Sequence, residues 1–316
     1  MSNILITGAT GFVGRGLCSR LLVEGRNLRC AVRQASSIAN SVAIGDIGPD
    51  THWDEALKGI DTVVHLAARV HVMKDNSSDP LAGFRCVNVD ATLNLARQAT
   101  VTGVKRFIFL STVKVNGEKT TSDHPYTEQD AHQPQDPYGI SKQEAEDGLL
   151  RLAEETGLEV VIIRPPLVYG PGVKGNFQSM MRWIGKGIPL PLGAIHNQRS
   201  LVALDNLVDV IISCIDHPAA AGQTFLVADG EDLSTTDLLR RVGQAMGKPA
   251  RLIPVPMSVL KLGARLLGKQ TMAQRLCGNL QVDISKAREV LGWTPPVSVD
   301  EGLGRAVRER GGEVVR

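Results

Sequence analysis

The first half of this 316-residue chain alternates short apolar runs with longer amphipathic segments. The apolar runs predict strands at 3–7, 28–33, 41–45, 61–66, 104–110 and 158–164. The amphipathic segments predict helices at 12–25, 52–58, 80–102 and 137–156. Nearly every position of the predicted strands is apolar, which is typical of a parallel sheet covered on both faces. We therefore expect an α/β fold with a doubly wound parallel (Rossmann) sheet.

Glycine and proline interrupt this alternation after residue 165, and a further strand-like run at 224–228 returns to the sheet. The remaining C-terminal part is helical and punctuated by proline. The pattern predicts two parts, a dinucleotide-binding domain and a smaller C-terminal substrate-binding domain. The first comprises 1–165 plus about 201–230, and the second comprises 166–200 plus 231–316.

One C-terminal segment, Met257–Arg275, is both amphipathic and basic. It has two interpretations. It packs on the smaller domain as an ordinary helix, with Lys261, Arg265 and Lys269 in solvent, or it lies on a membrane surface.

Composition narrows the class of protein. Hydrophobic residues make up 43% of the chain, charged residues 22%, and the formal net charge is +2. These values are typical of a soluble α/β protein and do not call for a nucleic-acid partner. The five cysteines are scattered without a Cys-x-x-Cys pair, which indicates a reduced, cytoplasmic compartment. No apolar stretch reaches the ~20 residues of a membrane span, and no motif predicts a metal site.

Three glycines follow the first predicted strand at the spacing Gly8-x-x-Gly11-x-x-Gly14. At a strand-to-helix junction, such glycines permit a tight turn, let the backbone approach a pyrophosphate, and let the helix pack closely on the sheet. The free backbone N–H groups of the first helical turn, near Phe12 and Val13, then face an anion. The motif predicts a dinucleotide site.

The choice of dinucleotide depends on the end of the second predicted strand, where NAD sites usually have a carboxylate. Arg33 stands there instead, positioned to pair with a 2′-phosphate or to stack on adenine. NADP(H) is therefore favoured and NAD(H) remains possible. Asp46 is placed to meet the adenine amino group or to cap its own loop. Leu66, Ala67 and Ala68 end the fourth strand with the small side chains that a close cofactor requires.

A tyrosine and a lysine, Tyr138 and Lys142, share one face of the last predicted helix because they are four residues apart. A nearby ammonium group favours the phenolate, so we expect Lys142 and the charge of the cofactor together to lower the Tyr138 pKa from about 10 by about two to three units. The phenol can then act as a general acid or base. Ser111 and Thr112 end the fifth strand, where one hydroxyl is expected to hold the substrate oxygen and the other to cap the strand.

Four motifs in combination resemble the extended short-chain dehydrogenase/reductases, a family that includes nucleotide-sugar epimerases, dehydratases and reductases. They are Thr7-Gly8-x-x-Gly11-x-x-Gly14, Ser111-Thr112, Tyr138-x-x-x-Lys142 and Arg164–Pro171. The stretch 169–177 is similar to 4-keto reductases of bacterial polysaccharide synthesis that form UDP-N-acetylquinovosamine.

The resemblance implies a role for each matched residue. Thr112, Tyr138 and Lys142 correspond to the catalytic set, and Asn116 stands where relatives often carry a tyrosine that contacts the sugar. Further cofactor contacts are implied at Ile47, Pro165 and Leu167. Substrate contacts are implied at Ser111, Thr112, Asn176, Arg199 and Arg275, the last three around the nucleotide diphosphate. A homodimer formed through helices 80–102 and 137–156 is also implied.

The function expected from this resemblance is NAD(P)H-dependent reduction of the C4 ketone of a UDP-linked 4-keto-6-deoxy-N-acetylhexosamine, in O-antigen or other surface-polysaccharide synthesis. Three alternatives stay open. One is a UDP-hexose 4-epimerase with tightly bound NAD, and another is a reductase of a ketone that carries no nucleotide. The third is a dinucleotide-binding regulator without chemistry.

Overall fold

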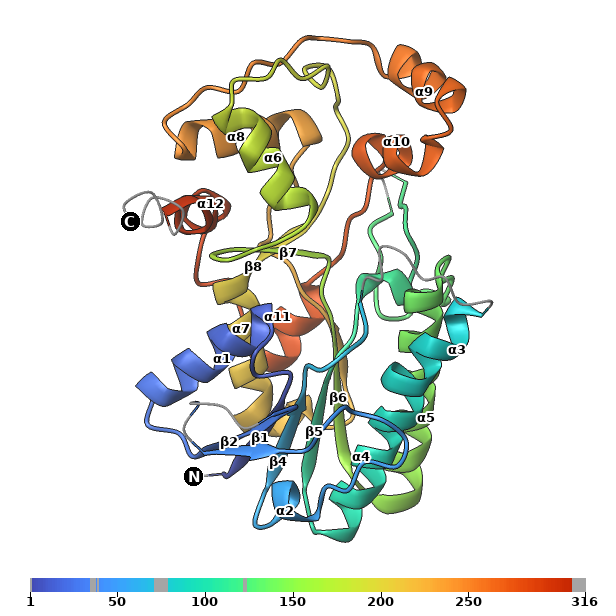
Figure 1. The fold of residues 1–316 in the computed structure, drawn as a ribbon, viewed down its shortest axis with the longest axis vertical. Helices are drawn as coiled ribbons and strands as arrows, with labels where there is room; N and C mark the ends of the chain where they lie inside the picture. Colours follow the sequence, from blue (N-terminus) through green and yellow to red (C-terminus); the bar gives the residue numbers. More distant parts are fainter. Residues whose placement is uncertain (1, 35–37, 39, 71–78, 122–123, 309–316) are drawn as a thin grey trace.

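The computed structural model describes residues 2–34, 38, 40–70, 79–121 and 124–308. Figure 1 shows a sheet flanked by helices at one end of the molecule and a smaller, mainly helical part at the other. The predicted α/β fold is confirmed. Within the described residues, no helix combines the length and the apolar character needed to cross a bilayer.

The main sheet is entirely parallel, with seven strands in the order β3-β2-β1-β4-β5-β6-β9. These are β1 (Ile4–Thr7), β2 (Leu28–Val32), β3 (Ser41–Ala43), β4 (Thr62–His65), β5 (Arg106–Leu110), β6 (Glu159–Arg164) and β9 (Thr224–Leu226). Each corresponds to a predicted strand. The chain runs outward from β1 to β3 and then crosses to β4, so the strand order reverses between β1 and β4. In such sheets the crevice outside the strand ends at this reversal binds ligands.

Alternate residues of each central strand enter two different hydrophobic cores, one on each face of the sheet. In β1, Ile4 and Ile6 belong to one core and Leu5 to the other. The first core packs under α1 (Phe12–Val23), α7 (Leu204–Asp216) and α11 (Ser285–Leu291). The second packs under α2 (Asp54–Leu57), α4 (Ala91–Val101) and α5 (Pro137–Thr156). The predicted burial of both faces is confirmed.

The helix predicted at 80–102 forms as three successive segments. They are α3 (Pro80–Arg85), one π-helical stretch (Cys86–Asp90) and α4. Two short 3-10 turns, Val113–Val115 and Pro218–Ala220, complete this part of the chain.

The smaller part has a third core of its own. It is built around a two-stranded parallel sheet of β7 (Leu167–Tyr169) and β8 (Leu201–Ala203). Three helices pack there: α6 (Asn176–Gly185), α8 (Thr235–Ala245) and α12 (Val299–Arg308). Two more, α9 (Met257–Leu266) and α10 (Gln270–Cys277), lie at its outer edge in Figure 1. The side chains of α11 belong to the core of the main sheet, although the sequence assigned this segment to the smaller domain. The domain boundaries stay a prediction.

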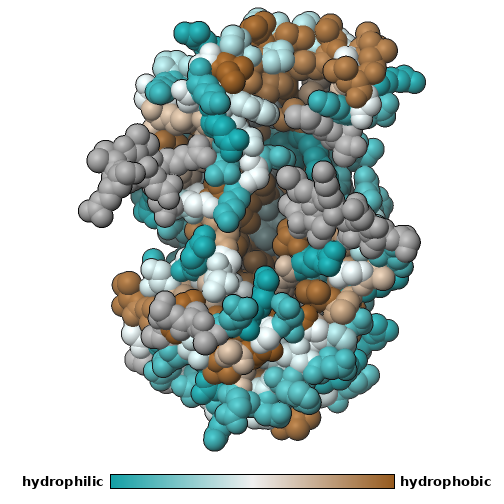
Figure 2. Space-filling view, viewed as in Figure 1, coloured by the Kyte–Doolittle hydropathy of each residue, from teal (hydrophilic) through white to brown (hydrophobic). Residues whose placement is uncertain are grey.

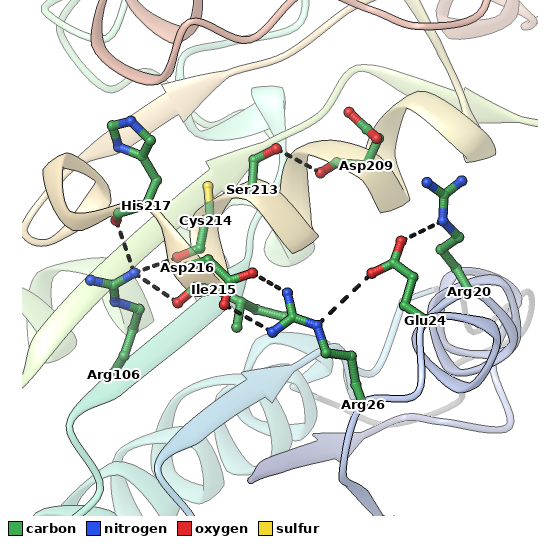
Figure 3. A network of polar contacts seen from close by, with 10 residues as sticks. All are labelled: Arg20, Glu24, Arg26, Arg106, Asp209, Ser213, Cys214, Ile215, Asp216 and His217. Carbon is green, nitrogen blue, oxygen red and sulfur yellow. Dashed lines mark hydrogen bonds and ion pairs between the residues drawn. The ribbon is translucent and has the colours of Figure 1, made fainter. Parts of the chain in front are cut away.

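A network at the amino end of the sheet holds α7 in place (Figure 3). The guanidinium of Arg106, at the start of β5, donates to the carbonyl oxygens of Cys214, Ile215 and His217 at 2.8, 2.9 and 3.0 Å. A buried cation there satisfies the last carbonyls of a helix and complements its dipole. Arg26 forms an ion pair with Asp216, in the last turn of α7. The last turn of α7 is thus attached to the main sheet, after the chain has returned from the smaller part.

A second, fully buried network fastens α5 to the carboxyl end of the sheet. Arg164, the last residue of β6, donates from Nε to both carboxylate oxygens of Glu146 at 3.1 Å. The two side chains are 4% and 0% exposed. The same guanidinium donates to Asn116 at 3.1 Å and contacts His132 at 2.7 Å, and the Ser111 hydroxyl donates to Glu146. This network determines where α5 lies relative to the ends of β5 and β6.

We expect Glu146→Ala to lower the free energy of unfolding by about 3–5 kcal/mol, because it leaves the Arg164 guanidinium buried without its partner. The matched control is Glu144→Ala, a substitution in the same helix as Glu146. It removes an ion pair between Glu144 and Arg85 at the protein surface, and we expect it to lower the free energy of unfolding by less than about 1 kcal/mol. Urea denaturation followed by circular dichroism measures both. Equal losses in the two variants would contradict the importance of the buried network.

Candidate active site

A large cavity, about 1340 Å³, lies between the carboxyl ends of the sheet and the smaller part. Figure 2 shows it as a hollow between the two ends of the molecule. Every residue predicted from the sequence to bind cofactor, bind substrate or act in catalysis lines this cavity. They are Gly8, Gly11, Phe12, Val13, Gly14, Arg33, Asp46, Ile47, Leu66, Ala67, Ala68, Ser111, Thr112, Tyr138, Lys142, Pro165, Leu167, Asn176, Arg199 and Arg275. The fold therefore brings together segments from most of the chain length.

The glycine loop leaves no room for side chains. Gly8 has a φ of +71°, and a Cβ there would lie 2.8 Å from the Ala67 nitrogen. A Cβ on Gly14 would lie 2.1 Å from the Gly8 carbonyl oxygen. The amino terminus of α1 has Gly11 as its N-cap with no side-chain hydrogen bond, so backbone N–H groups are left for a ligand. This cradle fits a dinucleotide pyrophosphate.

Arg33, after β2, and Asp46, after β3, lie at the rim of the cavity. Their side chains are 81% and 93% exposed, and Arg33 Nε lies 3.8 Å from Asp46 Oδ1. The sequence after β2 holds no carboxylate before Asp46. This end of the cavity is thus open to solvent, and its two charged side chains lie close to each other.

The catalytic candidates Tyr138 and Lys142 lie in the first two turns of α5. Pro137 occupies the first helical position, and the side chain of the N-cap Asp136 accepts the Gly139 N–H at 2.7 Å, so the start of the helix is well defined. The half-buried ring of Tyr138 packs against Phe84, with ring centroids 6.3 Å apart.

The contribution that the sequence led us to expect from Lys142, a lowering of the Tyr138 pKa, is wrong. Lys142 Nζ donates to the Leu110 carbonyl at 2.7 Å and lies 4.0 Å from the centroid of the Phe109 ring. Burial of this amine lowers the pKa of Lys142 to about 7. Burial also raises the pKa of Tyr138, and the Asp136 carboxylate raises it further. Spacing put the two residues on one face, but the amine is directed to the strand below.

The structure distinguishes the two hydroxyls that end β5. The Ser111 hydroxyl donates to the buried Glu146 carboxylate and is committed to that network. The Thr112 hydroxyl accepts the Lys114 N–H at 3.3 Å and keeps its own proton for another partner. Asn116, where a sugar contact was in question, is fully buried and donates to the Thr127 carbonyl at 2.9 Å. Its side chain therefore lies in the protein interior, where it bonds the Thr127 carbonyl and the Arg164 guanidinium.

The far end of the cavity carries two guanidinium groups. Arg199 Nη1 donates to the carbonyl oxygens of Arg275 and Gly278 at 3.0 and 3.1 Å. Burial lowers the pKa of Arg199, and the neighbouring charge of Arg275 lowers it further. Two like charges held this close favour a dianion between them. Asn176, the first residue of α6, also lines the cavity, and no side chain caps the backbone N–H groups of that first turn.

Sequence reasoning missed a charged group beside the tyrosine. Lys114 pairs with Asp136 and lies 3.3 Å from Glu118 Oε1, and its Nζ is 6.0 Å from the centroid of the Tyr138 ring. Glu118 Oε1 is buried and also lies 4.0 Å from an Arg275 nitrogen. The spacing of Lys114 and Glu118 just after Thr112 was the available signal. The apolar wall of α6 was missed because glycine and proline made the region look irregular.

Comparison with known proteins agrees with this geometry. The family model described as "NAD dependent epimerase/dehydratase family" matches residues 4–228. A protein of Vibrio cholerae named UDP-glucose 4-epimerase is 50% identical over 305 residues, covering 95% of this chain and 93% of its own length. An N-acetyl-alpha-D-glucosaminyl-diphospho-ditrans,octacis-undecaprenol 4-epimerase of Escherichia coli O157:H7 is 29% identical, covering 97% and 94%.

Among solved structures, the UDP-glucuronic acid 4-epimerase of Bacillus cereus in complex with NAD has the same fold. It superposes with a TM-score of 0.80 at 22% identity, covering 99% of this chain and all of that one. The narrower resemblance to UDP-N-acetylquinovosamine-forming reductases is not confirmed by these comparisons. The family model nevertheless covers more than half of the chain, so this protein is an enzyme of the NAD-dependent epimerase/dehydratase family, of the extended short-chain dehydrogenase/reductase type.

Proposed function

We propose that the protein is a UDP-hexose 4-epimerase that uses NAD and acts on UDP-glucose, UDP-galactose or their N-acetylated counterparts. One observation carries the proposal. A relative named UDP-glucose 4-epimerase shares 50% of its residues across 95% of this chain. The order of preference drawn from the sequence is thereby reversed, since the epimerase now stands ahead of the 4-keto reductase.

The residues present fit the cofactor. The glycine cradle and the free N–H groups at the start of α1 would hold the pyrophosphate. Arg33, Asp46 and Ile47 would surround the adenosine, and Pro165 and Leu167 would lie by the nicotinamide. When bound, NAD supplies the reversible acceptor for the hydride of sugar C4.

The protein's own residues would manage the proton on the sugar O4. With the positive charge of bound NAD beside it to lower its pKa, Tyr138 would act as the phenolate that takes this proton when the C4 ketone forms, and it would return the proton when the hydroxyl is restored. The Thr112 hydroxyl would donate a hydrogen bond to the same sugar oxygen, which holds that oxygen within reach of the Tyr138 phenol. Lys142 adds a donor beneath them, although its buried amine titrates near neutrality, with a pKa of about 7. The hydride removed from C4 and the proton removed from O4 both return to the sugar, so the reaction is redox-neutral overall.

The substrate diphosphate would be held away from the reacting carbon. Arg199 and Arg275 present two cations to the far end of the cavity, and Asn176 offers a polar side chain beside them. Binding energy from this remote group positions the sugar for transfer. We also infer a homodimer through α3, α4 and α5, which stays a prediction from the family resemblance.

A second candidate is the NADPH-dependent 4-keto reductase first expected from the sequence. The observation that favours it is Arg33 at the rim, with no carboxylate after β2 to bind a ribose 2′-OH. The two functions differ in their balance of electrons, because a reductase consumes one reduced nicotinamide for each product while an epimerase consumes none.

We expect purified protein to interconvert UDP-glucose and UDP-galactose, or the N-acetyl pair, without net change in absorbance of reduced nicotinamide. Tyr138→Phe should lower kcat by about 10²–10⁴-fold, because the proton acceptor is lost. Product is measured by anion-exchange chromatography, and NAD content by extraction. Turnover that requires stoichiometric NADPH and a 4-keto sugar would select the reductase. Near-normal activity in the Phe variant would contradict the assignment of Tyr138.

Stability should depend on pH through Lys142. Its folded-state pKa is lowered to about 7, below that of an unfolded lysine, so the cost of burying the ammonium is fully present below pH 7. This cost is relieved as pH rises above 7. Relative to Lys142→Met, the cofactor-free protein should gain about 1.4 kcal/mol of unfolding free energy per pH unit just above that pKa. Urea midpoints measured on both proteins across this range test it, and parallel pH profiles would contradict it.

Arg199→Gln should weaken binding of UDP by about 10–100-fold, since it removes a charge-assisted hydrogen bond to the diphosphate. Arg240→Gln is the matched control, because Arg240 is 57% exposed, does not line the cavity and pairs with Asp237 one turn away. Isothermal titration with UDP measures both. Unchanged affinity in the Arg199 variant, or an equal loss in the control, would argue for a substrate without a nucleotide diphosphate.

A further inference from the structure

Helix α9 turns its apolar face away from the protein. Val259, Leu262 and Leu266 are 55%, 59% and 80% exposed, and no residue of the helix is buried. Their spacing places them on one side of the helix. An amphipathic helix of a soluble domain normally directs this side to the core. In α9 the other side, with Leu260 and Ala264 only partly exposed, is turned inward as the helix packs on α10.

Further exposed apolar residues flank α9 in the sequence. Leu267, after the helix, is 72% exposed, and Ile253, just before it, is 50% exposed. We call Ile253, Val259, Leu262, Leu266 and Leu267 the α9 surface. Figure 2 shows hydrophobic atoms gathered at the end of the molecule where Figure 1 places α9. Apolar patches of this kind with a polar rim mark interaction sites.

Positive charge is concentrated around the α9 surface. Lys261 and Arg265 lie one turn apart beside the apolar face, and Lys269 follows the helix. Among the described residues, none of these three forms an ion pair with a carboxylate. From Leu238 to Val282 the sequence has no aspartate or glutamate. It has the cations Arg240, Arg241, Lys248, Arg251, Lys261, Arg265, Lys269 and Arg275. The whole chain, in contrast, is nearly neutral at +2.

We propose that α9 docks the enzyme on the surface of an anionic phospholipid bilayer. The apolar face would enter the boundary between headgroups and acyl chains, and the adjacent lysine and arginine side chains would meet lipid phosphates. A helix of 10 residues is about 15 Å long, too short to span the hydrocarbon layer, so it lies in the interface. A second copy fits less well, because a two-fold contact would set the same cations against each other.

Docking by α9 has a consequence for the cavity. The helix packs on α10, and α10 carries Arg275 and Leu276 into the cavity wall. A bilayer under α9 therefore lies beside the end of the cavity that holds Arg199 and Arg275. The proposal goes beyond the chemistry of the site and does not depend on which C4 reaction the enzyme performs.

The test is co-sedimentation of the full-length protein with lipid vesicles. We expect binding to vesicles of equal parts phosphatidylcholine and phosphatidylglycerol, at least about tenfold tighter than to phosphatidylcholine alone, and weaker at high salt. Leu262→Ser/Leu266→Ser should weaken binding by more than about tenfold. Lys261→Gln/Arg265→Gln should weaken it by about tenfold to thirtyfold on the anionic vesicles only.

The matched control is Leu22→Ser/Val23→Ser, which changes two apolar residues of α1 with similar exposure, 55% and 84%, on the sheet half of the molecule. It should bind vesicles as the parent does. All variants should keep the parent's melting temperature and its turnover of a soluble UDP-sugar, because none of these residues lines the cavity. Lost turnover in every protein would refute the proposed function and leave docking unaffected.

Three results would overturn the docking proposal. The parent protein stays in the supernatant with anionic vesicles, or the leucine variant binds as tightly as the parent. The third is a dimer, seen by light scattering, that Leu262→Ser/Leu266→Ser dissociates while vesicle binding is absent. That result would assign the α9 surface to a contact between copies of this chain.

Discussion

The buried ion pair between Glu146 and Arg164 is the contact on which the site depends. Glu146 belongs to α5 and Arg164 ends β6, so their hydrogen bonds set the position over the sheet of the helix that carries Tyr138 and Lys142. The Ser111 hydroxyl joins the same carboxylate from the end of β5. An isolated charge at this depth would cost far more than it contributes, and each partner is tolerated because the other is present. The pair therefore fixes the position of α5 relative to β6, because neither charge can be buried without the other.

The cavity itself is organised by charge along its length. Backbone N–H groups at the start of α1 face one portion, and the guanidinium groups of Arg199 and Arg275 face another. Both regions suit diphosphates, as two nucleotide-linked ligands would require. Between them, burial keeps the Tyr138 phenol protonated and brings the pKa of Lys142 near neutrality. The protein alone therefore holds a proton donor with a titratable amine below it, and the phenol needs added positive charge before it can act as a base.

The smaller part of the molecule connects the cavity to the outer surface. Its β7–β8 pair and the core beneath α6, α8 and α12 form a rigid wall. Helices α9 and α10 are attached to that wall from outside, and their basic, apolar character differs from the rest of a nearly neutral chain. Residues that line the cavity on α10 and residues exposed to the surroundings on α9 thus lie on consecutive helices.

The sequence by itself determined the sheet, its buried faces, the glycine cradle and the pairing of Tyr138 with Lys142 on one helix face. These features follow from local periodicity and from backbone positions that only glycine can occupy, so they can be read without knowing the tertiary contacts. Only the tertiary structure decided where Lys142 directs its amine, which strand-end hydroxyl remains free, and that Asn116 faces the interior. Each of these depends on partners far away in the chain. Burial by such partners changes the pKa of a group more than its neighbours in sequence do.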